Sequence, residues 1–236
     1  MPPPVPRPPA RLPLFPLPLV LFPGAAQPLH VFEPRYRRML VDVQAADGRF
    51  GLVAVTGADA GAPPPGRVGC VAQVRDVEPL PDGRSNLVAD GGARFAVVRL
   101  VDAGTPYLVA EVAPYDDAPD PAADPDALGA AAERVRALFD RVARAARAIA
   151  DEPGPAPALP DDPAEVAFAV AARVEFDLTA RQRLLASRSA LGRLDDVAEL
   201  LKRAVGNVEE RAATHARARS NGHGPAHGPP HGGPAA

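Results

Sequence analysis

Cysteine, tryptophan and lysine are scarce in this 236-residue chain, which contains one cysteine, one lysine and no tryptophan. Because Cys70 is the only cysteine, no disulfide can form within the chain, which fits a reducing cytoplasm. Cys70 lies in an apolar run over residues 68–74, so we expect it to be a buried strand thiol. A nucleophilic thiol would need an accessible and electropositive setting.

An excess of charge of one sign is also absent, since 26 basic and 29 acidic residues give a net charge of −3. This balance provides no general attraction to nucleic acid or to an anionic membrane. No stretch approaches the roughly 20 apolar residues that a membrane span needs. The apolar segment 12–22 is unsuited to a signal peptide, because its prolines would break the helical region. We therefore expect a soluble, cytoplasmic protein without nucleic-acid or membrane partners.

The first half of the chain has the short apolar segments and turn residues that are typical of β-structure. Residues 12–22 contain three prolines, which favours an edge strand, and Pro23-Gly24 predicts a turn. A helix is predicted from Pro34, because Tyr36, Met39, Leu40 and Val43 fall on one helical face. The sequences Pro81-Asp82-Gly83 and Asp90-Gly91-Gly92 predict two further turns. The strands are predicted at residues 12–22, 28–32, 50–55, 68–77, 85–89, 93–100 and 107–112.

The second half has helical periodicity and predicts a bundle of about four helices. Asp124 can cap a helix that begins with Pro125, and Asp162 can cap a second one. The segment from Thr179 to Gln182 predicts a capping box for a shorter helix. The last helix is predicted from the spacing of Leu191, Leu194, Val197, Leu201, Val205 and Val208. Between the two halves, Asp116, Asp117 and Asp120 are interpreted as part of a solvated acidic linker.

Four segments follow from these patterns. Residues 1–11 are predicted to be a disordered Pro-rich N-terminus, 12–118 a β-barrel, 119–214 a helical subdomain and 215–236 a disordered His/Gly/Pro tail. Three histidines of the tail lie four residues apart, a spacing that aligns metal ligands on a helix. Because glycine and proline surround each of them, no fixed helix is expected, and no metal site is predicted. These histidines are His223, His227 and His231.

A family resemblance rests on several motifs that occur in order along the chain. The sequence LPLFPLPLVLFPG followed by PLHVFEPRYRRM resembles the start of the N-terminal substrate-binding domain of Lon proteases. Three further elements of that domain have similar counterparts here. Its G-T-V-A strand resembles residues 69–72, its L-P-D-G turn resembles residues 80–83, and its E-G-x-x-R-F strand entry resembles residues 90–95. Residues 181–185 and Arg193-Leu194 resemble its [KR]-Q-x-L-L and R-L elements. The chain is most similar to free-standing bacterial proteins that consist of this domain alone.

The resemblance implies an α+β fold. We expect an N-terminal β pseudo-barrel, similar to PUA domains and with one inserted helix, followed by a C-terminal helical bundle.

Lon proteases are ATP-dependent peptidases, but the residues that such chemistry needs are missing here. A phosphate-binding loop ends in Lys-Ser/Thr, whereas the only lysine, Lys202, falls within a predicted helix. A Ser-Lys dyad needs a lysine that activates a serine, and no serine lies in a nucleophile motif. We therefore expect no enzymatic activity, no cofactor and no metal. The four serines are Ser85, Ser187, Ser189 and Ser220.

Binding is the function that remains. The resemblance implies a non-catalytic module that binds extended or unfolded polypeptide, as an adaptor or chaperone-like factor. An exposed barrel edge can pair with the backbone of an extended peptide. The groove between barrel and helices is the expected site, and in a binding role Glu33, Arg35 and Tyr36 would line it. The alternative is a regulatory sensor that binds a small ligand in the same groove. RNA binding, which PUA-like barrels allow, is disfavoured by the charge and by the lack of a basic aromatic surface.

Five residues are candidates for ligand contacts: Phe32, Glu33, Arg35, Tyr36 and Arg94. A structural interpretation competes with this one for three of them. In that interpretation Glu33 caps the first helix, Arg35 is its ion-pair partner and Tyr36 is a core ring. His30 alternates with apolar neighbours on a strand, so a hydrogen-bonded histidine is expected there. Core positions are expected for Phe15, Phe22, Phe32 and Phe95.

Overall fold

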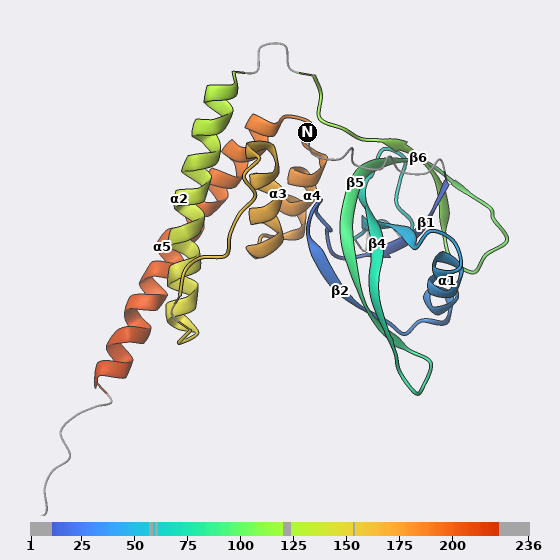
Figure 1. Cartoon of the computed structure of the whole chain (residues 1–236), viewed down its shortest axis with the longest axis horizontal. Helices are drawn as coiled ribbons and strands as arrows, with labels where there is room; N and C mark the ends of the chain where they lie inside the picture. Colours follow the sequence, from blue (N-terminus) through green and yellow to red (C-terminus); the bar gives the residue numbers. More distant parts are fainter. Residues whose placement is uncertain (1–10, 57–58, 60, 120–123, 153, 222–236) are drawn as a thin grey trace, which may run out of the picture.

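The computed structural model describes residues 11–56, 59, 61–119, 124–152 and 154–221. A β-barrel with one helix inserted comes first and a group of helices follows, which confirms the predicted α+β class (Figure 1). The strands are β1 (Arg11–Leu17), β2 (Ala26–Val31), β3 (Arg49–Ala54), β4 (Val68–Pro79), β5 (Ser85–Val101) and β6 (Val109–Pro114). The helices are α1 (Pro34–Gln44), inserted between β2 and β3, and α2 (Pro125–Ile149), α3 (Pro163–Arg173), α4 (Leu178–Ala186) and α5 (Ala190–Asn221).

The sheet closes because its longest strand, β5, pairs with three neighbours. The strand order is β2-β5-β4-β3-β1-β6, and a further pairing joins β5 to β6. All pairings are antiparallel except that of β1 with β3. Strand β2 pairs only with β5 among the described residues, so its other edge has no strand beside it. Pro28 in β2 lacks a backbone donor, which suits an edge position.

Two of the sequence-based strand predictions need correction. Strand β1 ends at Leu17 instead of continuing to residue 22, and Pro18, which follows, cannot donate a ladder hydrogen bond. The predicted turn at residues 90–92 is wrong, because β5 runs through this segment without interruption. A Cβ atom on Gly91 would lie 2.0 Å from the carbonyl oxygen of Phe22. The glycine is therefore needed for the close approach of two backbone segments, not for a turn.

The predicted hairpin turn between β4 and β5 is confirmed. Gly83 has a φ of +80°, a conformation that glycine adopts without strain. Its amide donates to the carbonyl oxygen of Leu80 at 2.9 Å, which closes the turn. The hairpin extends β4 and β5 beyond the closed part of the barrel (Figure 1).

Buried apolar residues form the interior of the barrel and, separately, its junction with the helices. Inside the barrel, the four predicted residues of α1 pack on Phe15, Phe50 and the residues around them. At the junction, Val20, Phe22 and Val68 of the barrel pack in one cluster with residues of α2 to α5. The two parts of the chain therefore share a continuous core.

Aspartate side chains cap three of the helices. Asp124 and Asp162 each accept a hydrogen bond, at 2.9 Å, from the amide two residues further on, as predicted. The predicted capping box at Thr179 is wrong, since Asp177 caps α4 by accepting from the amide of Ala180 at 2.8 Å. The buried face of this helix contains Ala180, Leu184 and Leu185.

The last helix is longer than predicted. Helix α5 continues to Asn221, so the first residues of the predicted tail 215–236 are helical. Its predicted apolar stripe is buried at Leu194, Val197, Leu201 and Val205. The predictions for residues 1–10, and for the tail histidines His223, His227 and His231, lie outside the described residues. None of the described helices has the length and apolar character to cross a membrane.

Candidate functional site

Four of the five predicted site residues lie together where β2 passes into α1. The Arg35 guanidinium contacts Glu33 Oε2 with Nε at 3.0 Å and Nη2 at 2.8 Å. It also lies over the Tyr36 ring, 4.5 Å from its centre. Glu33 occupies the N-cap position of α1, but its side chain makes no capping hydrogen bond. Its carboxylate is engaged by Arg35 instead.

Tyr36 and Phe32 point in opposite directions. Tyr36 is buried, its ring centre lies 4.3 Å from that of Phe15, and burial raises the pKa of its hydroxyl. Phe32 was expected in the core, but 58% of it is exposed. Its ring stacks on His30 at 5.9 Å, and Nδ1 of His30 lies 2.8 Å from Oδ1 of Asn86, as a hydrogen-bonded histidine should. Phe32 is therefore the candidate that is available to a ligand.

An open cleft lies next to this junction, between α1 and the β4–β5 hairpin. Its volume is about 710 Å³, and we call it the α1 cleft. The lining residues are Pro34, Arg37, Arg38, Leu40, Val41 and Gln44 from α1, and Val77, Pro79, Gly83 and Ser85 from the hairpin. Val41, one of the lining residues, is 60% exposed. Phe32 precedes Pro34, the first lining residue in chain order, by two positions. Sequence patterns did not predict this cleft. They identify the buried stripe of α1, and Val41 lies outside that stripe.

A second hollow, of about 570 Å³, lies between the barrel and α3, where a groove was predicted, but none of the five predicted site residues lines it. We call it the barrel–helix groove. One wall is backbone around Gly24 and Gly91, and the other is α3 with Phe168 and Ala172. The lining residues are Pro23, Gly24, Ala25, Ala26, Gly91, Gly92, Pro160, Glu165, Phe168, Ala169, Ala172 and Arg173.

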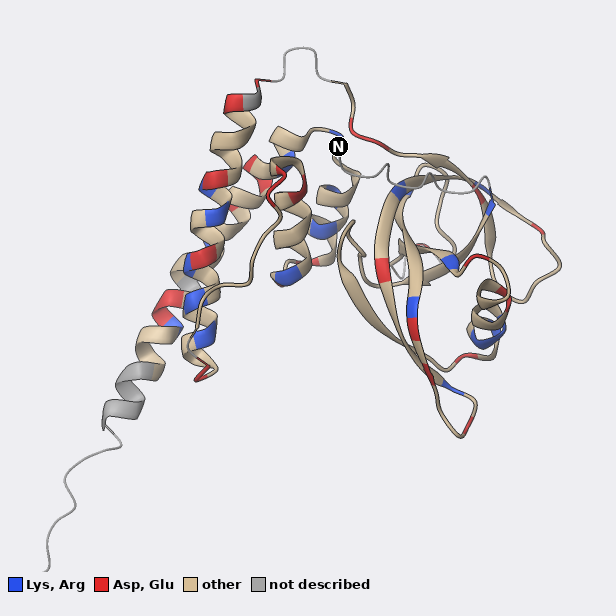
Figure 2. Cartoon of the chain, in the orientation of Figure 1, with Lys and Arg blue, Asp and Glu red and all other residues tan. Residues whose placement is uncertain are grey.

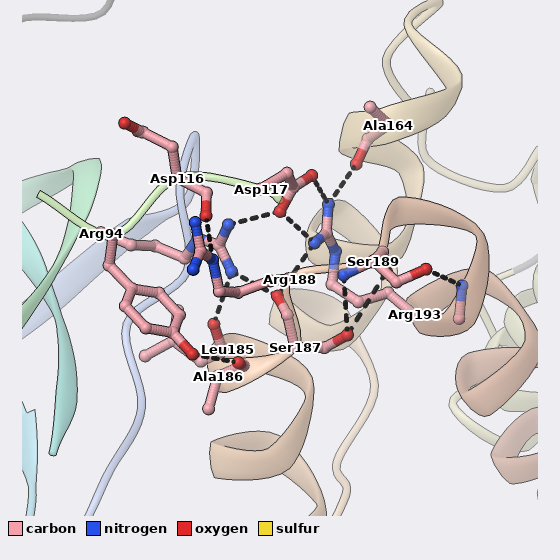
Figure 3. A network of polar contacts seen from close by, with 12 residues as sticks. Arg94, Asp116, Asp117, Ala164, Leu185, Ala186, Ser187, Arg188, Ser189 and Arg193 are labelled. Atoms are coloured by element: carbon pink, nitrogen blue, oxygen red, sulfur yellow. Dashed lines mark hydrogen bonds and ion pairs between the residues drawn. The ribbon is translucent and has the colours of Figure 1, made fainter. Parts of the chain in front are cut away.

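Arg94, the fifth predicted site residue, lies apart from the other four, at the junction of barrel and helices (Figure 3). Its side chain is 6% exposed. Nη1 donates to the carbonyl oxygens of Leu185 at 2.8 Å and Ser187 at 2.6 Å, and Nη2 contacts Asp117 at 2.5 Å. These carbonyls belong to the end of α4, which has no intrahelical donors for them. Arg94 thus caps a helix, and it lines none of the clefts described here.

Asp117 joins Arg94 to a second buried arginine, Arg193 of α5. Arg193 is 1% exposed and contacts both oxygens of the carboxylate, at 2.5 and 2.7 Å. Burial alone would raise the pKa of Asp117, but the hydrogen bonds and charges of both arginines outweigh it and lower the pKa. Burial lowers the pKa of Arg94, against the opposing charge of Asp117. The prediction that Asp117 is a solvated linker residue is wrong, because two buried arginines converge on it.

Other contacts complete this attachment of the helices to the barrel. The Tyr115 hydroxyl donates to the carbonyl oxygen of Ala186 at 2.8 Å. Arg181 donates to the carbonyl oxygen of Val20 at 3.1 Å, and Gln182 to that of Val68 at 3.0 Å. One signal for a buried Arg193 exists in the sequence, since it stands one helical turn before Val197 on the apolar face of α5. No comparable local signal marks Asp117.

Cys70 and Lys202 carry the side chains with the greatest potential reactivity. Cys70 is buried, and burial raises the pKa of its thiol to about 12, so the thiolate that nucleophilic attack requires is scarce. Lys202 is exposed and pairs with Glu199 at 2.7 Å. Across the described residues, no three His, Cys, Asp or Glu side chains are grouped so as to hold a metal ion.

The fold is that of the N-terminal domains of Lon proteases. A Lon N-terminal domain protein from Xanthomonas campestris has a crystal structure that matches with a TM-score of 0.54 and 27% identity, over 78% of this chain and 95% of that one. The N-terminal domain of a Mycobacterium avium complex Lon protease matches with a TM-score of 0.59 and 16% identity, over 81% and 98%. The second likeness concerns the fold alone.

Sequence comparison places the chain in a family. Residues 11–203 match the family described as the ATP-dependent protease La (LON) substrate-binding domain, and the chain belongs to it. It is 30% identical to the Lon protease of Xanthomonas oryzae pv. oryzae over 84% of its length, and 28% identical to Lon protease 1 of Syntrophobacter fumaroxidans over 78%. The matched part is 23% of each of these two relatives.

Proposed function

We propose that this domain binds extended or unfolded polypeptide at the α1 cleft and the adjoining edge of β2, without catalysing a reaction. The observation that supports this most directly is the open α1 cleft, which is lined by the exposed Val41, with the exposed Phe32 just before α1 in the chain. Exposed apolar side chains at the rim of a cleft are typical of protein interaction sites. An extended chain would place one of its apolar side chains in the cleft and another against Phe32.

The edge of β2 would provide backbone contacts. Its outer side faces no other described strand, so an extended peptide can pair with it and add to the sheet. Backbone hydrogen bonds bind any sequence, while the pockets beside them select side chains. Affinity for many unfolded chains would follow, as an adaptor or chaperone-like factor needs. No catalytic step is assigned, because the family match is confined to the substrate-binding domain.

The test compares exposed apolar residues inside and outside the proposed site. Phe32→Asp and Val41→Asp are each expected to weaken binding about fivefold or more, because each removes an apolar contact at the centre of the site. Val98→Asp is the matched control, since Val98 is 48% exposed on β5 and lines none of the clefts described above. Fluorescence anisotropy with a labelled, reduced and carbamidomethylated protein measures the affinity.

Two results would contradict the proposal. One is the absence of measurable binding by the wild-type protein. The other is equal weakening by Val98→Asp, which would indicate nonspecific adhesion to exposed apolar surface. Circular dichroism of each variant verifies that the fold is retained.

The barrel–helix groove supports a second candidate function, the binding of a small ligand as a regulatory sensor. The groove combines the buried aromatic ring of Phe168 with the charged side chains of Glu165 and Arg173, as sites for small polar ligands do. A thermal-shift screen against metabolites tests this candidate. Ala172→Phe should abolish any shift, because the larger side chain fills the groove, whereas Phe32→Asp should leave the shift unchanged.

A further inference from the structure

The α1 cleft is basic. Arg37 and Arg38 are its ionisable lining residues, and none of the described carboxylates lines it. A hollow on the outer face of β2, β5 and β4 has the opposite character, because Asp76 and Glu78 line it together with His30. The two sides of the β4–β5 hairpin therefore present charges of opposite sign to a polypeptide that contacts both. Figure 2 shows basic residues in blue and acidic residues in red close together around α1 and the hairpin.

Arg37 differs from the arginines around it because its guanidinium pairs with no carboxylate among the described residues. Arg35 pairs with Glu33, Arg38 with Asp42 and Arg84 with Asp82. Each of those three arginines is therefore already neutralised by a neighbouring carboxylate. The Arg37 side chain makes no hydrogen bond or ion pair within the part of the chain that the structure describes, whereas its backbone amide donates to the carbonyl oxygen of Glu33.

The position of Arg37 is set by the hairpin. Its guanidinium lies against Gly83, where a Cβ atom would come within 2.1 Å of Nη2. The guanidinium therefore packs against the turn where glycine leaves room for it, and both residues line the cleft. From there its donors can reach a carboxylate that enters the cleft, and arginine binds carboxylates through two parallel hydrogen bonds.

We infer that the α1 cleft selects polypeptide segments in which an acidic side chain lies two residues from an apolar one. Residues two apart in an extended chain lie on the same side of it, so both can enter one cleft. The apolar side chain contacts Val41 and Leu40, and the aspartate or glutamate binds Arg37. This inference rests on the proposed function and adds the class of segment that is preferred.

The experiment uses three labelled peptides that are identical except at one position. Each has leucine and valine at alternate positions, and the variable position, which holds glutamate, glutamine or lysine, lies two residues from one of them. At pH 7 and low salt, the glutamate peptide is expected to bind the full chain about threefold more tightly than the glutamine peptide, as an exposed ion pair allows. The lysine peptide is expected to bind most weakly.

Variants of Arg37 then assign the preference to one residue. Arg37→Gln should remove the difference between the glutamate and glutamine peptides, and Arg37→Glu should reverse the order so that the lysine peptide binds best. Arg203→Gln, at an exposed position of α5, is the matched control and should preserve the wild-type preference. Because Arg37 is exposed, these substitutions are not expected to disturb folding.

The outcomes separate the two proposals. Equal affinities of the wild-type protein for all three peptides would overturn the charge preference and leave the proposed polypeptide binding intact. A glutamate preference that survives in Arg37→Glu would also overturn the assignment. Failure of all three peptides to bind would overturn the proposed function and, with it, this inference.

Discussion

The barrel and the helical part differ in where they expose apolar side chains. Among the described residues, the large apolar side chains that are exposed all belong to the barrel, and they are Phe32, Val41, Val98 and Leu100. Helices α2 to α5 have none of this kind among their described residues, and ion pairs such as Arg141–Glu209 link α2 to α5. Figure 2 shows charges of both signs along these two helices.

This difference indicates a division of roles. Scattered apolar residues on a barrel with an open cleft and an unpaired edge suit contact with other chains. Helices that are polar outside and apolar inside suit support of the barrel. The buried charged residues, Arg94 and Arg193, lie between the two parts, where Asp117 joins them. We therefore expect that changes at the junction alter stability and that changes on the barrel surface alter binding.

The largest effect is expected from removing the carboxylate that joins the two parts. Asp117→Ala leaves Arg94 and Arg193 close together without a counter-charge. Breaking a buried ion pair costs about 3–5 kcal/mol, and we expect about 3 kcal/mol because the carboxylate is 35% exposed. Urea denaturation measures the free energy of unfolding.

The neighbouring Asp116 provides the control for this variant. Its side chain is exposed, and its contact with Arg188 is made by the backbone carbonyl oxygen. Asp116→Ala should change stability by no more than about 0.5 kcal/mol. Equal losses for the two variants would refute the role of the buried pair.

A somewhat smaller loss is expected at Gly91. Gly91→Ala forces a Cβ atom against the carbonyl oxygen of Phe22, a backbone atom that moves only if the junction shifts. Overpacking of this kind costs about 2 kcal/mol. Gly92→Ala is the matched control, because its nearest atom would be 3.5 Å away, an ordinary contact. Equal losses for the two variants in thermal unfolding would contradict the role of the close backbone approach at Gly91.

Acid should weaken the junction to a lesser extent. The pKa of Asp117 lies below its ordinary 3.8 in the folded protein, so the folded state holds this proton less tightly than the unfolded chain does. The stabilisation is complete above the unfolded pKa and is lost as the pH falls through the folded one. Denaturation curves should be measured between pH 5 and pH 2, which lie about one to two units on either side of the ordinary pKa of an aspartate. The free energy of unfolding should depend less on pH in Asp117→Ala than in the wild type. Parallel curves would contradict this.

The smallest effect is expected at Cys70, whose thiol should be nearly inert towards a thiol reagent in the native protein. Its pKa is raised to about 12 by burial inside the barrel. Reaction should begin only when denaturant opens the barrel. Thiol labelling compared with the loss of helical circular dichroism then shows whether the two parts unfold together. Labelling that precedes the loss of helix would show that the barrel opens first.

Local sequence patterns predicted much of the fold and part of the junction between β2 and α1. The buried stripe of α1, the hairpin at Gly83 and the caps at Asp124 and Asp162 depend on neighbours within a few residues, and all were found. Phe32 was placed wrongly in the core. Its exposure depends on how β2 lies on the sheet, which alternation alone does not reveal.

The sequence by itself determined the α+β class, the order of barrel and helices, and the family, because periodicity, turn residues and motif order are local properties. Only the tertiary structure decided which charges are buried and which clefts are open. Asp117 meets Arg193 across 76 positions of the chain, and Arg37 meets Gly83 only because the tip of the hairpin lies beside α1. Contacts of that kind are set by the packing of distant segments, so single-residue patterns contain no record of them.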